Sequence, residues 1–152
     1  IGNGDVASAI IDQPGKIFFA SGVSNSSCID WHDFQREKNL LLEQKKISHL
    51  VYFSTLSIYY ADTPYTRHKK MMERLVKDNF AVTTIIRLGN ITWGGGNPNT
   101  LLNYLKAHPE AERRNEIRYF IDKEEFQHWL SMIPDWSTEM NLTGKMINVK
   151  DL

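Results

Sequence analysis

Short apolar runs with strand character alternate with stretches of helical spacing along almost the whole chain. The strand-like runs cover residues 16–20, 49–54, 81–88, 117–121 and 145–149. The helical stretches cover residues 5–11, 31–44, 64–78 and 100–107, and one more begins after Asp122. Parallel strands need long crossover connections, and helices supply them. The alternation therefore predicts an α/β domain in which helices cover both faces of a parallel sheet.

Residues that favour helix starts stand at three of the expected boundaries. Asp30 is a suitable N-cap for the helix over 31–44, and Pro64 suits the first position of the next helix. Asp122 with Glu125 three residues on has the spacing of a capping box. Within 31–44, one side of the helix is expected to carry Trp31, Phe34, Lys38, Leu41 and Leu42.

The bulk composition narrows the classes of function. The 152 residues fit one domain, with a nucleotide-binding core over 1–94 and a small C-terminal substrate portion over 95–152. Lys plus Arg and Asp plus Glu both number 18, so neither nucleic acid nor a membrane surface is an expected partner. One cysteine and scattered histidines predict no metal site. No apolar run approaches the about 20 residues of a membrane helix, and without a signal peptide the cytoplasm is the expected location.

A glycine loop opens the chain with the pattern Gly2-x-Gly4-x-x-Ala7. In a dinucleotide-binding loop the first glycine permits a tight turn, and the second lets the backbone approach the pyrophosphate. The small third residue lets the following helix pack closely. Alone the pattern is weak and also fits an ordinary strand–helix turn. The chain begins on Ile1, so the strand leading into the loop is expected to be missing or cut short.

Tyr65 and Lys69 stand four residues apart within one expected helix, downstream of a strand that ends in Ser54 and Thr55. With Met72 and Val76, which continue the same stripe, they share one helix face. A lysine on an inward stripe is costly unless it has a partner or a chemical task. This pair is therefore the main candidate for chemistry.

A second pair with the same spacing, Tyr119 and Lys123, straddles a strand and the first turn of a helix. Its side chains need not share a face. We therefore expect this second pair to have no catalytic role.

These residue types suit proton transfer to and from an alcohol oxygen. A free tyrosine has a pKa near 10, and a nearby lysine ammonium favours the phenolate. Lowering the pKa of Tyr65 by about three units would take about 4 kcal/mol of differential stabilisation. The hydroxyl of Thr55, or that of Ser54, would hold the substrate oxygen.

The Tyr-x-x-x-Lys pair after a Ser/Thr-bearing strand, together with the glycine loop, resembles the short-chain dehydrogenase/reductase superfamily. The similarity is greater to its extended branch, the NAD-dependent sugar epimerases and dehydratases. Four further segments resemble that branch: residues 51–59 its strand five, 19–22 its strand four, 86–91 the segment after strand six, and 118–122 a late Arg-Asp-Phe stretch.

The resemblance implies a shortened Rossmann-like fold, NAD or NADP as cofactor, and a nucleotide-sugar-like substrate. It implies a catalytic set in which Thr55 orients the substrate oxygen, Tyr65 is the acid/base, and Lys69 lowers the pKa of Tyr65 and holds the nicotinamide ribose. The implied cofactor-binding residues are Gly2, Asn3, Gly4, Asp5, Val6, Ala20, Ser21, Gly22, Ser54, Tyr65 and Lys69. The implied substrate contacts are Ser24, Asn25 and Asn90. A second copy of the chain, forming a homodimer, is a further expected partner.

The chain also departs from the pattern of that branch. The stretch for strands two and three is essentially absent, and no acid stands about 20 residues after the glycine loop; Asp12 lies too early. Leu56 and Ser57 replace an acidic pair that the dehydratases carry, which counts against dehydration. Epimerisation and ketone reduction stay open. So does a non-catalytic NAD(P)-binding regulatory or scaffold protein, although the retained Thr55, Tyr65 and Lys69 favour an enzyme.

Overall fold

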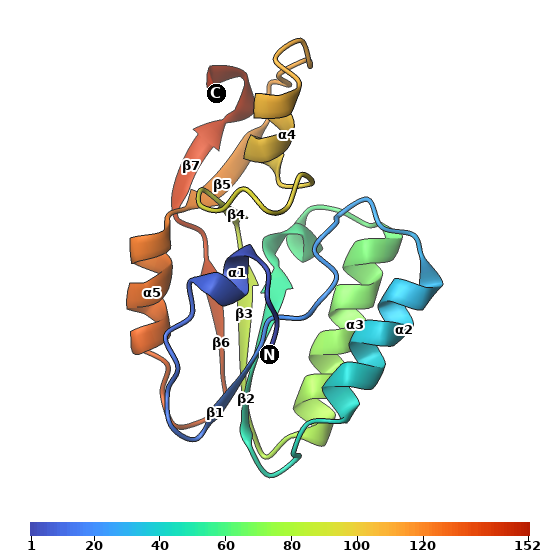
Figure 1. Ribbon diagram of the computed structural model, residues 1–152, viewed down its shortest axis with the longest axis vertical. Helices are drawn as coiled ribbons and strands as arrows, with labels where there is room; N and C mark the ends of the chain where they lie inside the picture. The colour runs from blue at the N-terminus through green and yellow to red at the C-terminus, as the bar shows by residue number, and fades with distance from the viewer.

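The computed structural model describes residues 1–152, and its centre is a four-stranded sheet (Figure 1). Its strands are β1 (Lys16–Phe19), β2 (His49–Thr55), β3 (Val82–Leu88) and β6 (Thr138–Leu142). They lie in the order β1-β2-β3-β6, and all neighbouring pairs are parallel. The expected parallel sheet is therefore confirmed, while β6 is a strand that the sequence pattern did not indicate.

The glycine loop lies at the end of β1. The amino group of Ile1 donates to the carbonyl of Phe18 at 2.6 Å, and the amide of Ala20 donates to the carbonyl of Ile1 at 2.8 Å. Ile1 thus runs alongside the end of β1. The loop that follows is held at the carboxyl edge of the sheet, which is where open α/β sheets bind ligands.

Helices cover both faces of the sheet, as expected (Figure 1). One face is covered by α2 (Trp31–Leu42) and α3 (Pro64–Asn79), and the other by α5 (Lys123–Ser131) and the short α1 (Asp5–Ser8). Because successive strand side chains point to opposite faces, β2 supplies both cores. Tyr52 packs with the buried residues of α2 and α3, whereas Phe53 packs with those of α5.

Local signals set most helix starts. Asp30 accepts a hydrogen bond from the amide of His32, and Asp122 accepts one from the amide of Glu125. Pro64 occupies the first turn of α3, as expected. The N-cap of α3 is Thr63, which forms a reciprocal capping box with Thr66.

The prediction of which residues of α2 face inward is partly wrong. Leu41 is fully buried, but Trp31 is 65% exposed at the start of the helix. The inward position one turn before Leu41 is taken by Glu37, which is completely buried. The helix predicted over residues 5–11 is also shorter than expected. It ends at Ser8, where the chain turns toward β1.

A smaller three-stranded sheet lies beyond the carboxyl edge of the main sheet (Figure 1). It consists of β4 (Asn90–Ile91), β5 (Ile117–Ile121) and β7 (Lys145–Asn148), accompanied by α4 (Leu101–Ala107). Two 3-10 helices, η1 (Leu56–Tyr59) and η2 (Val149–Asp151), complete the elements. Residues 95–152 do not stand apart from residues 1–94, because β6 joins the main sheet and α5 covers it.

None of the helices has the length and apolar character that crossing a membrane requires.

Candidate functional site

A cleft of about 1180 Å³ opens at the carboxyl edge of the main sheet. Its walls come from the glycine loop, the loop after β1, the end of β2, the first turns of α3, the segment after β3, and α4. The structure brings all the candidate residues of the sequence analysis to this cleft: Gly2, Asn3, Gly4, Asp5, Val6, Ala20, Ser21, Gly22, Ser24, Asn25, Ser54, Thr55, Tyr65, Lys69 and Asn90. Their individual roles stay predictions.

The two glycines of the loop meet different constraints. Gly2 has a φ of 124°, and a Cβ there would lie 2.5 Å from the carbonyl oxygen of Ala20, so the turn requires glycine. A Cβ on Gly4 would meet no atom within 4 Å. The packing of this chain therefore does not require glycine at Gly4. The open space there is suited to the close approach of a ligand to the backbone.

Residues 94–97 are tied to the glycine loop through Asp5. The carboxylate of Asp5 accepts from the amides of Gly96 at 3.4 Å and Asn97 at 3.2 Å. The indole of Trp93 donates to the carbonyl of Asp5 at 2.8 Å, and the side-chain amide of Asn97 donates to the hydroxyl of Ser24 at 3.1 Å. The Asp5 carboxylate is therefore occupied by this segment and adds a negative charge beside the expected phosphate position.

Tyr65 and Lys69 lie on the inward face of α3, and both side chains are buried. The Lys69 ammonium is 5.8 Å from the centre of the Tyr65 ring. The Thr55 hydroxyl neighbours Tyr65 and accepts from the amide of Ser57 at 3.1 Å. Thr55, Tyr65 and Lys69 therefore form one contiguous group at the end of β2.

Ser54 differs from its neighbour Thr55. Its hydroxyl is buried and has no hydrogen-bond partner within the protein, although the residue lines the cleft. Buried polar groups are nearly always hydrogen-bonded in folded proteins. This orphaned hydroxyl therefore fits a polar ligand in the cleft.

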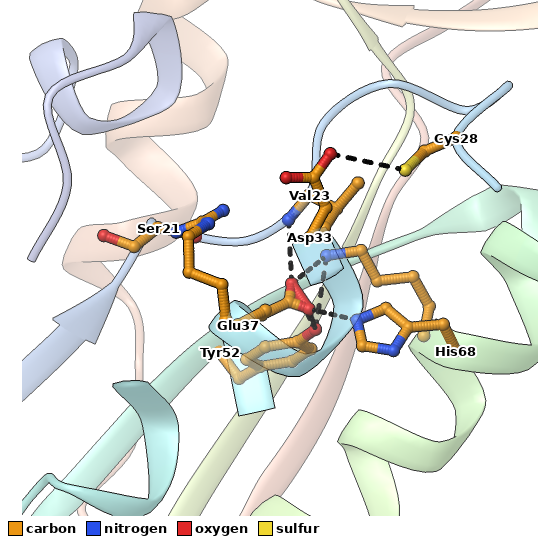
Figure 2. A network of polar contacts seen from close by, with 9 residues as sticks. Ser21, Val23, Cys28, Asp33, Glu37, Tyr52 and His68 are labelled. Atoms are coloured by element: carbon orange, nitrogen blue, oxygen red, sulfur yellow. Dashed lines mark hydrogen bonds and ion pairs between the residues drawn. The ribbon is translucent and has the colours of Figure 1, made fainter. Parts of the chain in front are cut away.

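The structure adds Glu37 to this group (Figure 2). One carboxylate oxygen accepts from the Lys69 ammonium at 2.7 Å and from the amide of Val23 at 2.9 Å. The other oxygen lies 2.6 Å from Nε2 of His68, and the Tyr52 hydroxyl is 3.3 Å from both oxygens. The sequence offered one signal for such a residue, namely a lysine on an inward stripe that needs a partner.

The buried ion pair determines the charge of both partners. Burial opposes ionisation of Glu37, but Lys69 and His68 outweigh it and lower the pKa of the carboxyl to about 2. For Lys69, burial alone would lower the pKa of the ammonium, but Tyr52 and Glu37 raise it above its usual value. Glu37 is therefore a carboxylate and Lys69 an ammonium at neutral pH.

Tyr65 does not have the lowered pKa that its spacing from Lys69 led us to expect. Burial raises the pKa of its phenol, and the charge of Glu37 raises it further. Lys69 and the neighbouring Thr55 hydroxyl lower it, but they do not outweigh these effects. The expectation counted the lysine but left out burial of the phenol, which is the largest effect, and the carboxylate of Glu37. In the protein by itself, Tyr65 keeps its proton at neutral pH.

The expected substrate contacts and the second Tyr/Lys pair have ordinary local partners. The side-chain amide of Asn90 donates to the carbonyl of Tyr119 at 3.1 Å, and the side-chain oxygen of Asn25 accepts from the amide of Ser27 at 3.0 Å. Tyr119 lies in β5, whereas Lys123 is the first residue of α5. The second pair therefore does not share a helix face.

The fold is similar to that of solved nucleotide-sugar enzymes, although no protein-family model and no curated protein sequence matches the chain. MoeE5, solved in complex with UDP-glucuronic acid and NAD, has a TM-score of 0.71 and 18% identity, over 90% of this chain and 59% of that chain. UDP-glucose 4-epimerase from Thermus thermophilus, solved with NAD, has a TM-score of 0.66 and 12% identity, over 91% of this chain and 59% of that chain.

A third structure is UDP-N-acetylglucosamine 4-epimerase from Methanobrevibacter ruminantium, in complex with UDP-N-acetylmuramic acid. Its TM-score is 0.60 and its identity 14%, over 98% of this chain and 61% of that chain. This chain thus spans less than two thirds of each of the three structures. It has the Rossmann-like α/β fold in a shortened form.

Proposed function

We propose that this protein is an NAD(P)-dependent oxidoreductase or epimerase that acts at a carbinol or keto carbon of a nucleotide-linked sugar. The observation that carries the proposal is the convergence of Thr55, Tyr65 and Lys69 with the glycine loop on one cleft. The cleft lies at the carboxyl edge of a parallel sheet, the usual ligand-binding edge of such folds. Fold neighbours solved with NAD or with UDP-sugars support the same ligand classes for this chain.

Several features of the cleft fit a dinucleotide. Gly4 leaves open space at the loop where a pyrophosphate would approach the backbone, and Ser54 offers a buried hydroxyl without a partner. The adenosine half fits less well. The chain passes from α1 to β1 without an intervening strand, so no acid stands where a ribose hydroxyl is usually bound.

The proposed chemistry assigns one task to each side chain. A bound nicotinamide ring would accept a hydride from the carbinol carbon or return one to the keto carbon. Thr55 holds the substrate oxygen, and Tyr65 takes the hydroxyl proton during oxidation or gives a proton to the oxygen during reduction. Lys69 favours the phenolate through its charge. Return of the hydride to the opposite face of the sugar carbon gives epimerisation.

The rim of the cleft supports a phosphate-bearing substrate. Arg36, Arg114 and Arg118 all line it; Arg36 donates to the carbonyl of Ser21 at 3.2 Å, and Arg118 pairs with Glu116 at 3.2 Å. Guanidinium groups bind phosphate oxygens in a fixed, often bidentate geometry. These guanidinium groups would therefore bind the diphosphate of a nucleotide-linked sugar.

The alternative is a non-catalytic NAD(P)-binding protein, and one observation favours it. The Asp5 carboxylate stands in the phosphate loop and is held there by residues 94–97. Its negative charge weakens binding of a pyrophosphate, and weak cofactor binding fits a protein that does not turn over a substrate.

The deciding experiment has two parts. Mass spectrometry of the gently purified protein should detect a bound dinucleotide or nucleotide sugar. Incubation with NAD and a panel of UDP-hexoses should then interconvert a sugar or change the absorbance of reduced nicotinamide. Dinucleotide binding without turnover of any sugar would favour the alternative, and the absence of both would contradict the proposal.

A further inference from the structure

Glu37 lies beside the proposed catalytic group, and no role in the chemistry has yet been assigned to it. Its side chain points from α2 toward Tyr52 and His68 (Figure 2). It is completely buried, and every side-chain contact of its carboxylate is made with β2 or α3. A charge placed this deeply is retained only with partners, and removal of one partner leaves the other uncompensated.

The contacts of the Lys69 ammonium are shared between Glu37 and Tyr52. Nζ donates to the carboxylate at 2.7 Å and to the Tyr52 hydroxyl at 3.2 Å. An ammonium has three protons, so one remains for the cleft that Lys69 lines. A Cβ on Gly22 would lie 2.7 Å from Nζ, so the glycine gives the ammonium its room. Glu37 therefore fixes both the place of the ammonium and the direction of its free N–H.

The charges around Tyr65 come from several elements. The titratable side chains that face Tyr65 or the neighbouring Glu37–Lys69 ion pair come from different parts of the fold. They are Lys69 and His68 on α3, Glu37 on α2, Tyr52 on β2, Tyr60 after η1, and Cys28 in the loop before α2. Among those close to Tyr65, only Lys69 favours the phenolate by its charge. Glu37 opposes it.

We propose that Glu37 is a positioning residue of the site: it holds the Lys69 ammonium in place and offsets the charge that this ammonium presents to Tyr65. The inference rests on the proposed function, since the charge presented to Tyr65 matters only if Tyr65 transfers a proton. A phenol is the form that protonates a carbonyl oxygen. Burial by itself keeps Tyr65 in this phenol form, and Glu37 weakens the effect by which Lys69 favours the phenolate that oxidation requires.

The test follows the ionisation of Tyr65 directly, without cofactor or substrate. Ultraviolet titration of tyrosinate is recorded for the wild type and for Tyr65→Phe, and the difference isolates Tyr65. The same pair is then measured in a Glu37→Gln background. We expect the titration midpoint of Tyr65 to fall by at least about one pH unit, a tenfold change in proton affinity. A midpoint that is unchanged or higher overturns the inference.

Glu73→Gln is the matched control. Glu73 is also a buried carboxylate on the same face of the sheet, but it pairs with Arg87 at 2.8 Å rather than with Lys69. Its replacement should leave the midpoint of Tyr65 where it is, and an equal fall would show an unspecific effect of losing a buried charge. If Glu37→Gln does not fold, Glu37→Asp should lower the midpoint by a smaller amount, and an unchanged or raised midpoint contradicts the inference.

A kinetic arm separates the inference from the proposed function. In Glu37→Gln, the pH at which sugar oxidation reaches half of its maximal rate should fall together with the midpoint of Tyr65. A protein with no turnover and a shifted midpoint would contradict the proposed function and leave the positioning role of Glu37 supported. Turnover with an unshifted midpoint would support the proposed function and contradict the positioning role of Glu37.

Discussion

The Lys69 ammonium lies 2.7 Å from a carboxylate oxygen of Glu37, and both side chains are almost completely buried. The pair connects α2 to α3 beneath the cleft, within reach of Tyr52 and His68. Burial raises the pKa of Tyr65, Lys69 lowers it, and Glu37 raises it further. The effect of the lysine on Tyr65 is therefore offset in part by the carboxylate that pairs with it.

The first prediction concerns acid stability. The pKa of Glu37 is lowered from 4.5 to about 2 in the folded protein. A lowered carboxyl pKa contributes stability that is complete above the unfolded value and is lost as the pH falls toward the folded value. The shift corresponds to about 3 kcal/mol. In urea unfolding, the wild type should have the higher free energy of unfolding at pH 5, and its advantage over Glu37→Gln should shrink as the pH falls to 2. The advantage should shrink by no more than about 3 kcal/mol. An advantage that stays constant would contradict the ionised state of Glu37.

The second prediction separates the two glycines of the loop. Gly2→Ala should destabilise the fold, because a Cβ at a φ of 124° meets the Ala20 carbonyl at 2.5 Å. Gly4→Ala should leave the melting temperature within a few degrees, since its Cβ meets nothing within 4 Å, but should weaken dinucleotide binding about tenfold or more. Calorimetry of unfolding and of binding measures both. Equal cofactor affinity in Gly4→Ala would show that the loop does not approach the ligand.

The third prediction concerns the adenosine half of the cofactor site. No strand lies between α1 and β1, and Asp12 precedes β1 in a connecting segment. Without an acid at the ribose, we expect weak binding and a preference between NAD and NADP below about tenfold, or 1.4 kcal/mol. Calorimetric titration with both cofactors measures this ratio. A hundredfold preference would require another segment to supply the ribose contact.

Periodicity and local chemistry predicted much of the fold and identified most of the candidate residues that line the cleft. The stripe of Tyr65, Lys69, Met72 and Val76 is buried as its helical spacing requires. Asp30 and Asp122 cap helices because a side-chain oxygen at a helix start can accept a hydrogen bond from a backbone amide that has no partner within the helix. Such signals depend on neighbours in sequence, so they are visible without a structure.

The features that were missed depend on partners far away in sequence. Glu37 reads as an ordinary polar helix position, and its burial depends on His68 and Lys69, which lie 31 and 32 residues further along the chain. The segment Thr138–Leu142 mixes polar and apolar residues and becomes β6 by pairing with β3. The raised pKa of Tyr65 depends on burial and on Glu37 together, neither of which is visible in the Tyr-x-x-x-Lys pattern.

The most direct measurement is the turnover and cofactor affinity of Tyr65→Phe, with Tyr119→Phe as its internal control. Tyr65→Phe removes one transferable proton from the cleft, so sugar turnover should fall at least about a hundredfold while dinucleotide affinity stays within a few-fold. Tyr119 lies in β5 with its carbonyl bonded to Asn90, and its substitution should leave proton transfer intact. Wild-type turnover in Tyr65→Phe, or a folded Tyr119→Phe that is equally inactive, would contradict the account.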